Sequence, residues 1–214
     1  MDENKLLKTG TTNVGIVCRD GIVLGADRKV TLGGSIVSSK KFEKVIIINE
    51  DIAVTVAGLV SDIQLLTKLI RAQIKIDELR KNRKLKVKEV ANLLANLVYQ
   101  NVRKYSTIEG ITAFLLGGRD KEGTYLYQIG MDGSCSKYDD YTSEGSGMLF
   151  AIGVLEANYK ENLNVEDGVK LVVSALNASM QRDAASGAGC DVITVTKDGT
   201  KKVFSKQLDT RVSA

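Results

Sequence analysis

The segment NVGIVCRDGIVLGAD, residues 13–27, contains two short apolar runs on either side of a polar turn. An Asp-Gly pair between two apolar runs is a strong signal for a β-hairpin. Residues 44–58 repeat the pattern, because KVIIIN and IAVTVAG flank the polar pair Glu50 and Asp51. Short β-branched runs favour strands over helices. This part of the chain therefore predicts two antiparallel hairpins.

The spacing of apolar residues changes to three and four after Gly58, which is typical of amphipathic helices. We expect Ser61 and Asp62 to cap the first helix. Apolar residues at helical spacing follow at Ile63, Leu66, Leu69, Ile70 and Ile74, and again at Val87, Val90, Ala91, Leu94, Leu97 and Val98. These two runs predict a helical hairpin.

The remainder of the chain repeats the order of strands followed by helices. We expect strands at 111–117, 124–130 and 134–138, helices at about 148–159 and 165–184, and a closing hairpin formed by 191–196 and 202–204. Strand groups separated by two helix pairs predict two antiparallel sheets packed face to face, with a helical layer outside each. The predicted fold is thus α+β, a four-layer αββα sandwich, and 214 residues without a visible linker fit it as a single domain.

The absence of histidine narrows the possible chemistry more than the average composition does. It excludes Ser-His-Asp and Cys-His catalysis and any zinc site that needs imidazole. The three cysteines, Cys18, Cys135 and Cys190, form no CxxC pair, and we interpret them as small buried thiols in a reducing cytoplasm. The sequence implies no metal and no organic cofactor.

The amino-terminal decapeptide MDENKLLKTG carries four charged side chains around two leucines, so it cannot serve as a signal peptide. We interpret it as a short polar leader. Elsewhere, no run approaches the roughly 20 apolar residues that a membrane-spanning helix needs. We therefore expect a soluble, cytoplasmic protein that does not interact with membranes.

Charge is distributed unevenly, although the formal net charge is only +4. Residues 71–89 contain eight basic and three acidic side chains and no aromatic one. A nucleic-acid platform usually interleaves aromatic side chains with such charge. We favour a solvated tip between two helices, with a protein-partner contact as the alternative, and expect no nucleic-acid binding.

A hydroxyl nucleophile in a chain without histidine needs another base, either a lysine or, for threonine, its own terminal amine. Thr11 and Thr12 directly follow Gly10. Cleavage after Gly10 would give Thr11 a free α-amine, whose ordinary pKa of about 8 suits a general base. In an arbitrary protein the two threonines would simply open a strand, so the surrounding motifs decide between these interpretations.

Five short motifs follow one another along the chain. They are Gly10-Thr11-Thr12 with Val14-Gly15, Gly25-Ala26-Asp27-Arg28, Ala57-Gly58, Gly145-Ser146-Gly147 leading into Gly153-Val154-Leu155-Glu156, and Arg182-Asp183 with Ser186-Gly187. In these motifs, and from Gly10 to about Arg211, the sequence resembles the β-subunits of archaeal-type 20S proteasomes, which are N-terminal nucleophile hydrolases. The fold of that family agrees with the αββα sandwich that periodicity predicts.

The resemblance implies a threonine endopeptidase whose nucleophile is Thr11. It also implies that residues 1–10 are a propeptide removed by autocleavage between Gly10 and Thr11, which leaves a single hydrolase domain at 11–214. Asp27 matches the family's acidic residue, and Lys44 matches the lysine beside the threonine. Either that lysine or the terminal amine would take the proton of the hydroxyl.

Further site residues come from the same resemblance. Gly58 matches the position whose backbone N–H stabilises the oxyanion. Ser146, Asp183 and Ser186 match the network that supports the terminal amine. No metal belongs to this site.

The assignment of the lysine depends on counting, because Lys40 and Lys41 are close to Lys44. Counting back from Gly58 reaches Lys44 without a gap, whereas counting from Asp27 requires one extra residue within 31–43. We assign the catalytic role to Lys44 and interpret Lys40 and Lys41 as solvated loop charges.

Val30, Ile46 and Val56 match positions that line the pocket for the side chain before the cut bond, and Thr31 matches a position that pairs with substrate backbone. None of the four is charged. Because burying an unpaired charge in an apolar pocket is costly, we expect cleavage after hydrophobic residues.

The partners implied by the resemblance are proteasome α-subunits, other β-subunits in a heptameric ring, an ATP-dependent unfoldase and polypeptide substrates. A non-catalytic structural subunit is one alternative, but the presence of Thr11, Asp27, Lys44 and Asp183 argues against it. A small-molecule amidase of the same hydrolase class is the other, and the motifs at 145–147 and 182–183 argue against that.

Overall fold

The computed structural model describes residues 10–33 and 35–209. Its helices and strands follow one another as β1 (Asn13–Cys18), β2 (Gly21–Asp27), β3 (Val30–Leu32), β4 (Ile36–Ser39), β5 (Val45–Ile47), β6 (Ile52–Gly58), α1 (Val60–Lys81), α2 (Val87–Arg103), β7 (Thr112–Asp120), β8 (Gly123–Ile129), β9 (Cys135–Tyr138), β10 (Tyr141–Glu144), α3 (Met148–Asn158), α4 (Val165–Arg182), β11 (Gly189–Thr196) and β12 (Gly199–Gln207). The leader expected at residues 1–10 lies outside the described residues, except for Gly10.

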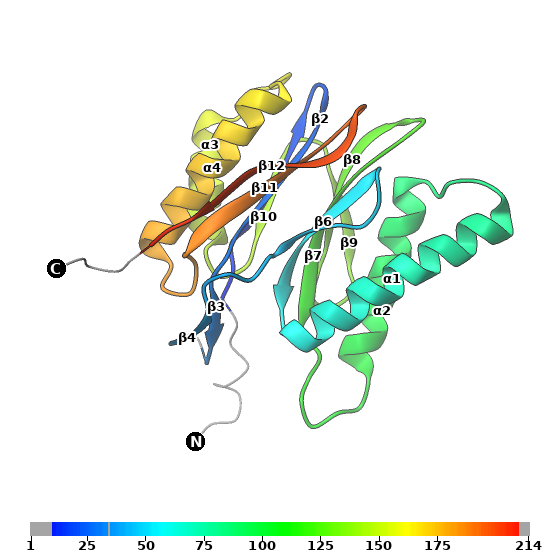
Figure 1. Cartoon of the computed structure of the whole chain (residues 1–214), viewed down its shortest axis with the longest axis horizontal. Coiled ribbons are helices and arrows are strands. Elements are labelled where there is room, and N and C mark those ends of the chain that lie inside the picture. The colour runs from blue at the N-terminus through cyan, green and yellow to red at the C-terminus, as the bar shows by residue number, and fades with distance from the viewer. Residues whose placement is uncertain (1–9, 34, 210–214) are drawn as a thin grey trace.

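These elements form four layers, with α3 and α4 outside one sheet and α1 and α2 outside the other (Figure 1). The first sheet has the strand order β10-β1-β2-β11-β12, and the second has the order β5-β6-β7-β8-β9. All strand pairs in both sheets are antiparallel. The predicted αββα sandwich is therefore confirmed.

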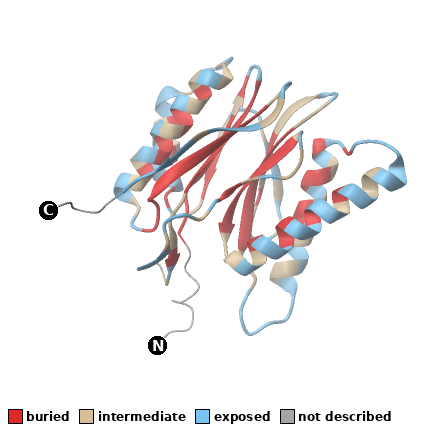
Figure 2. Ribbon diagram, viewed as in Figure 1, coloured by how far each residue is buried: buried red, intermediate tan, exposed pale blue. Residues whose placement is uncertain are grey.

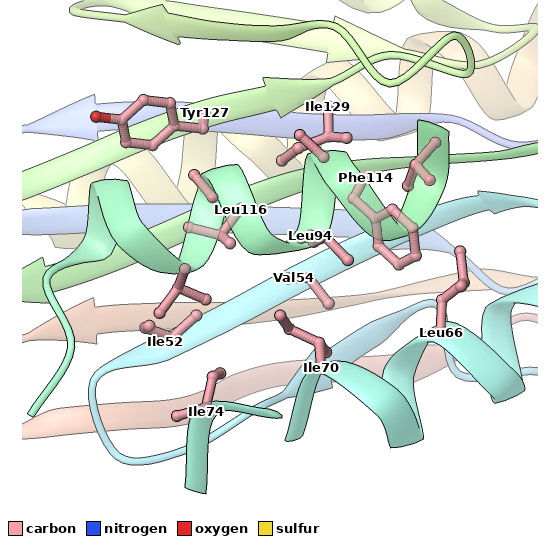
Figure 3. Close-up of a cluster of buried hydrophobic side chains, with 14 of the residues drawn as sticks. Ile52, Val54, Leu66, Ile70, Ile74, Leu94, Phe114, Leu116, Tyr127 and Ile129 are labelled. Atoms are coloured by element: carbon pink, nitrogen blue, oxygen red, sulfur yellow. The ribbon is translucent and has the colours of Figure 1, made fainter. Parts of the chain in front are cut away.

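Three apolar clusters hold the layers together, and buried residues fill the middle of the molecule (Figure 2). Strand β2 contributes to two of them, because alternate side chains of a strand point to opposite faces. Ile22 and Leu24 pack between the two sheets, whereas Val23 packs under α3 and α4. Figure 3 shows the third cluster, where α1 and α2 cover the second sheet around Phe114 and Leu94. Complete burial of one such side chain contributes about 1.5–3 kcal/mol.

Three strands and one helix start differ from the sequence-based expectations. The strands β3, β4 and β10 were not expected, and each has only three or four residues. The expected cap at Ser61 and Asp62 is wrong, because α1 begins at Val60 with Leu59 preceding it. The Asp62 carboxylate instead accepts hydrogen bonds from Asn101 Nδ2 at 3.0 Å and from the Ile111 backbone N–H at 3.1 Å. Partners distant in sequence thus replace the local cap.

The basic segment at 71–89 forms the tip between α1 and α2 and the ends of both helices. Four of its eight basic side chains are paired with acids: Lys81 and Arg83 with Glu89, Lys84 with Asp51, and Lys86 with Glu122. Pairing of this kind fits the favoured interpretation of a solvated tip. Among the described residues, no helix is both long and apolar enough to cross a membrane.

The antiparallel arrangement brings the termini of several strands to the same end of the first sheet. Strand β1 starts at Asn13, which pairs with Ala26 near the end of β2 and with Glu144 at the end of β10. Cys190, near the start of β11, pairs with Asp27. The loops that enter β1, leave β2, leave β10 and enter β11 therefore meet at one place, where the site described next is found.

Candidate active site

Thr11 lies immediately before β1 and is almost completely buried, with 4% of its surface exposed. Its hydroxyl donates a hydrogen bond to the Gly10 carbonyl oxygen at 2.6 Å and accepts one from Lys44 Nζ at 2.9 Å. Lys44 Nζ also lies 3.2 Å from the Gly10 carbonyl oxygen. A potential nucleophile, a lysine and the carbonyl group that precedes the nucleophile are therefore in mutual contact.

Asp27 holds the lysine from the other side. Lys44 Nζ donates to Asp27 Oδ1 at 2.8 Å, and both side chains are buried. The carboxylate also accepts hydrogen bonds from the backbone N–H groups of Thr12, Lys29 and Gly187 at 2.9–3.0 Å. These donors satisfy a buried charge and fix its direction, because buried carboxylates are tolerated only when paired and hydrogen-bonded.

The structure separates the three candidate lysines. Lys44 is 3% exposed and contacts Thr11, whereas Lys40 and Lys41 lie on the surface. Burial lowers the pKa of the Lys44 ammonium, while the charge of Asp27 and its hydrogen bond act in the opposite direction. A buried amine with a lowered pKa beside a hydroxyl is a suitable group for moving a proton.

A second group of residues faces the backbone nitrogen of Thr11. Ser146, in the loop between β10 and α3, accepts a hydrogen bond from Thr11 N at 3.2 Å and donates one to Asp183 Oδ2 at 2.6 Å. Ser186 donates to the same carboxylate oxygen at 2.5 Å. Asp183 follows the end of α4, so these three residues meet at the nitrogen that would become the terminal amine.

Gly58 ends β6 with φ = +118°, a conformation that side chains disfavour. A Cβ atom at this position would lie 2.0 Å from the carbonyl oxygen of Ile111. Both the backbone angle and the space therefore require glycine here. Gly58 lines the same small cavity as Thr11, which places its backbone beside the candidate nucleophile.

That cavity has a volume of about 10 Å³. Its lining is mainly apolar and consists of Gly10, Thr11, Val30, Phe42, Lys44, Val56, Gly58, Val60 and Ile63. Val30 and Val56, two of the expected pocket residues, are part of this lining. Ile46 is not part of it; like Phe42, it packs against the cluster under α1 and α2 that includes Ile63.

Thr31 contacts the backbone of the leader. Its hydroxyl oxygen accepts a hydrogen bond from the Gly10 N–H at 3.2 Å. A side chain that pairs with the residue before Thr11 is positioned to pair with the equivalent residue of a substrate.

Sequence reasoning missed four residues of this site: Thr12, Phe42, Val60 and Ile63. Thr12 joins the two groups of residues described above, through Asp27 and through Ser186. Phe42 and Val60 lie two residues from Lys44 and Gly58, and that proximity was the signal that could have identified them. The sequence gives no such signal for Ile63, because its position matches the ordinary apolar spacing of α1.

No metal-binding constellation occurs in the part of the chain that the structure describes. Its Cys, Asp and Glu residues form no group of three or more that could hold a metal ion. All three cysteines are free thiols. Burial raises the pKa of Cys18 to about 12 and of Cys190 to about 11, which makes both unreactive at neutral pH.

Comparisons with known proteins agree with this geometry. A family model described as "Proteasome subunit" matches residues 7–195. A proteasome subunit beta of Archaeoglobus profundus is 39% identical over 212 residues, which cover 99% of this chain and 96% of the relative. Proteasome subunit beta 2 of Pyrococcus abyssi is 40% identical over 93% of each chain. A proteasome subunit beta of Methanohalophilus mahii is 36% identical over 98% of this chain and 97% of its own.

Proposed function

The chain belongs to the proteasome subunit family, and from this premise we propose how Thr11 is activated and where it works. The protein is a catalytic β-subunit of a 20S proteasome and a threonine peptidase of the N-terminal nucleophile class. The observation that carries the proposed mechanism is the 2.9 Å contact between Lys44 Nζ and Thr11 Oγ1.

In the proposed reaction, Thr11 Oγ1 attacks the carbonyl carbon of a peptide bond while its proton passes to Lys44 or to the terminal amine. Asp27 keeps Lys44 in contact with the hydroxyl. The Gly58 N–H stabilises the oxyanion, and removal of one such donor typically costs roughly 3 kcal/mol. The C–N bond then breaks, the leaving amine takes the proton, and water hydrolyses the resulting ester of Thr11.

Leader removal uses the same groups. Thr11 Oγ1 attacks the carbonyl carbon of Gly10, so that an ester forms, the amide between Gly10 and Thr11 breaks and the freed Thr11 nitrogen takes the hydroxyl proton. Water then hydrolyses this ester, which releases residues 1–10 and restores the Thr11 hydroxyl. What supports the proposal is the contact of the Gly10 carbonyl oxygen with both the Thr11 hydroxyl and Lys44. Ser146, Asp183 and Ser186 then position the new amine.

Proteasome β-subunits assemble with α-subunits and with other β-subunits in a core particle. Large apolar side chains on the helical layers support such contacts, because exposed apolar patches mark interaction surfaces. Leu149, in the first turn of α3, is 72% exposed, and its neighbours Met148 and Phe150 are 39% and 43% exposed. We propose rings of seven β-subunits and delivery of unfolded polypeptides by an ATP-dependent unfoldase.

Cleavage after hydrophobic residues is part of the proposal. The side chains of Val30, Phe42, Val56 and Ile63 make the cavity beside Thr11 apolar. Removal of Gly10 with the leader would free space in this cavity for the side chain of a substrate. A cytoplasmic location is also proposed, since three free thiols are typical of a reducing compartment.

The decisive experiment follows mass, size and activity together. Mixed with α-subunits from the same organism, the chain should enter a large particle, lose residues 1–10 and cleave fluorogenic peptides that carry a hydrophobic residue before the cut. The isolated chain should keep its leader and have little activity, because the Thr11 hydroxyl donates to the Gly10 carbonyl oxygen in the single chain, and contacts within the particle must still bring Thr11 Oγ1 onto the carbonyl carbon. Robust turnover in a monomer-sized fraction would contradict the proposal and favour a small-molecule amidase. A particle without peptidase activity would instead favour a non-catalytic subunit.

A further inference from the structure

Thr12 is completely buried and bonds to both groups of residues around Thr11. Its backbone N–H donates to Asp27 Oδ1 at 3.0 Å, the same oxygen that Lys44 contacts. Its hydroxyl lies 2.7 Å from Ser186 Oγ, on the side of Asp183 and Ser146. One residue next to the nucleophile thus connects the lysine group, through its backbone N–H, with the serine group, through its hydroxyl.

The direction of the Thr12–Ser186 hydrogen bond follows from counting hydrogens. An ionised Asp183 carboxylate can only accept, so Ser186 must donate its single hydroxyl hydrogen to Asp183 Oδ2. The Ser186 oxygen is then left to accept the hydrogen of Thr12. Ser186 is the described partner of the Thr12 hydroxyl, so Thr12 satisfies its own donor only by this arrangement.

The remainder of the chain of hydrogen bonds is determined in the same way. Ser146 donates to Asp183 at 2.6 Å, in preference to a longer 3.3 Å contact with the Thr11 carbonyl oxygen. The Ser146 oxygen can therefore accept from the nitrogen of Thr11. An amine that donates to Ser146 keeps its lone pair available for the proton of the Thr11 hydroxyl.

Gly147 provides the space for this arrangement. A Cβ atom at Gly147 would lie 2.0 Å from the Thr12 hydroxyl oxygen and 3.2 Å from Asp183 Oδ2. The backbone of Gly147 has φ = −90°, which any residue can adopt, so the absence of a side chain rather than an unusual angle is what the site requires. The last glycine of Gly145-Ser146-Gly147 thus serves the Thr12 hydroxyl.

We propose that the Thr12 hydroxyl is a positioning group of the active site, which orients Ser186 toward Asp183 and thereby sets the hydrogen-bond direction at the Thr11 amine. This inference rests on the proposed function, because it gives Thr12 a role only if the amine and hydroxyl of Thr11 react. Without the Thr12 hydroxyl, the Ser186 oxygen loses the donor that anchors it, and the hydrogen bond from Ser186 to Asp183 weakens. The less well-satisfied carboxylate has a stronger negative potential, which raises the pKa of the Thr11 ammonium.

The test uses Thr12→Val, which removes the hydroxyl at nearly constant shape, and Thr12→Ser, which keeps it. Both full-length chains are assembled with α-subunits, and leader removal, kcat, KM and the pH dependence of kcat/KM are measured with a hydrophobic fluorogenic peptide. We expect Thr12→Val to lower kcat about tenfold, equivalent to about 1.4 kcal/mol, with KM within about twofold of wild type. The acid limb of its profile of kcat/KM against pH should move to higher pH. Thr12→Ser should restore most of the activity and return the acid limb to its wild-type position.

Whether Thr12 acts through Ser186 is tested with Ser186→Ala, alone and combined with Thr12→Val. If Thr12 acts through Ser186, the second substitution adds little to the first. A Thr12→Val particle that removes its leader and matches wild type in kcat and pH profile would overturn the inference. So would a loss of activity without movement of the acid limb, because that indicates general loosening.

Failure of Thr12→Val to assemble would be resolved with Thr12→Ala, which also lacks the hydroxyl but leaves no methyl group against Ser186. If neither variant assembles while Thr12→Ser does, Thr12 serves folding and the positioning role is wrong. If a variant assembles but keeps its leader, the inference is overturned, because the Thr11 amine that Thr12 is proposed to position does not exist before the leader is removed. An inactive wild-type particle would contradict the proposed function itself and is distinguishable from all these outcomes.

Discussion

The ammonium of Lys44 lies 2.9 Å from the hydroxyl oxygen of Thr11, although 33 residues separate the two along the chain. Both side chains are buried, and Asp27 holds the lysine at 2.8 Å from the opposite side. The contact exists in the chain that still contains residues 1–10. The proposed self-processing depends on this contact between Thr11, Lys44 and the Gly10 carbonyl.

Substitution of Thr11 tests self-processing. Thr11→Ala should retain residues 1–10 and abolish peptidase activity, because the hydroxyl that attacks the Gly10 carbonyl is absent. Thr11→Ser keeps a hydroxyl and should lose the leader. Intact-mass measurement of the assembled particles distinguishes the variants, and normal trimming of Thr11→Ala would mean that another protease removes the leader.

Substitution of Lys44 tests the choice among the three lysines. Lys44→Met keeps the length of the side chain but removes the ammonium, so peptide hydrolysis should fall roughly 10²- to 10⁴-fold, the usual range for a lost proton-transfer group. Size-exclusion chromatography should still show the assembled particle, since the Asp27 carboxylate keeps three backbone donors.

The matched controls are Lys40→Met and Lys41→Met. Both side chains are on the surface, and exposed charges usually contribute less than about 1 kcal/mol. We expect their kcat/KM to stay within about twofold of wild type. Full activity of Lys44→Met would show that the lysine was misassigned.

Gly10→Ala tests the fit of the leader at the cleavage point. A Cβ atom on Gly10 would lie 1.8 Å from Ala185 Cβ and 2.8 Å from Ala185 Cα, so the backbone must move. This shift should take the Gly10 carbonyl away from Thr11 Oγ1 and slow leader removal severalfold, as followed by mass against time.

The double variant Gly10→Ala with Ala185→Gly should recover only part of the rate. It removes the nearest carbon atom but leaves the Ala185 backbone, whose oxygen would lie 2.9 Å from the new Cβ. Processing of Gly10→Ala at the wild-type rate would contradict the close contact.

The raised pKa of the Glu144 carboxyl predicts that the stability of the folded chain depends on pH. Glu144 pairs with Asn13 across β1 and β10, and burial raises its pKa from 4.5 to about 7, with the Asn13 side chain opposing this. Between these values the folded chain keeps a proton that the unfolded chain has lost. The free energy of unfolding should therefore fall as pH rises from about 4.5 to 7, by on the order of 3 kcal/mol.

Glu144→Gln removes this titration, so its Tm relative to wild type should increase over the same interval and stay constant below and above it. Thermal unfolding at a series of pH values measures the difference. A difference in Tm that does not vary with pH would show that Glu144 titrates normally.

The strand runs and helical periods predicted the four layers because each pattern reports which face of an element is buried. Residues 13–27 predicted the β1–β2 hairpin, and the spacing after Gly58 predicted α1 and α2. The short strands β3, β4 and β10 escaped this reasoning. Each has three or four residues, too few to carry a period, and each forms through pairing with a partner strand.

The motifs likewise predicted a site formed by Thr11, Asp27, Lys44, Gly58, Ser146, Asp183 and Ser186, and the structure places these residues close together. Thr12 was quoted only as a neighbour, because a hydroxyl acquires a role through the donor and acceptor that it meets. Its partners, Asp27 and Ser186, are 15 and 174 residues away in the chain. Asp62 was predicted to cap a helix for the same reason: its partners, Asn101 and Ile111, are distant in sequence and only the folded structure shows them.

Local patterns along the chain were thus sufficient for the class of fold and for predicting Thr11 as nucleophile and Lys44 as its lysine, because hydrophobic period and motif order are properties of neighbouring residues. The direction of each hydrogen bond, the need for glycine at 10, 58 and 147, and the raised pKa of Glu144 came from the folded structure. These properties depend on which atoms lie within about 3 Å of one another. Antiparallel pairing of β1 with β2 and β10, and of β2 with β11, creates those contacts between segments that are far apart in the sequence.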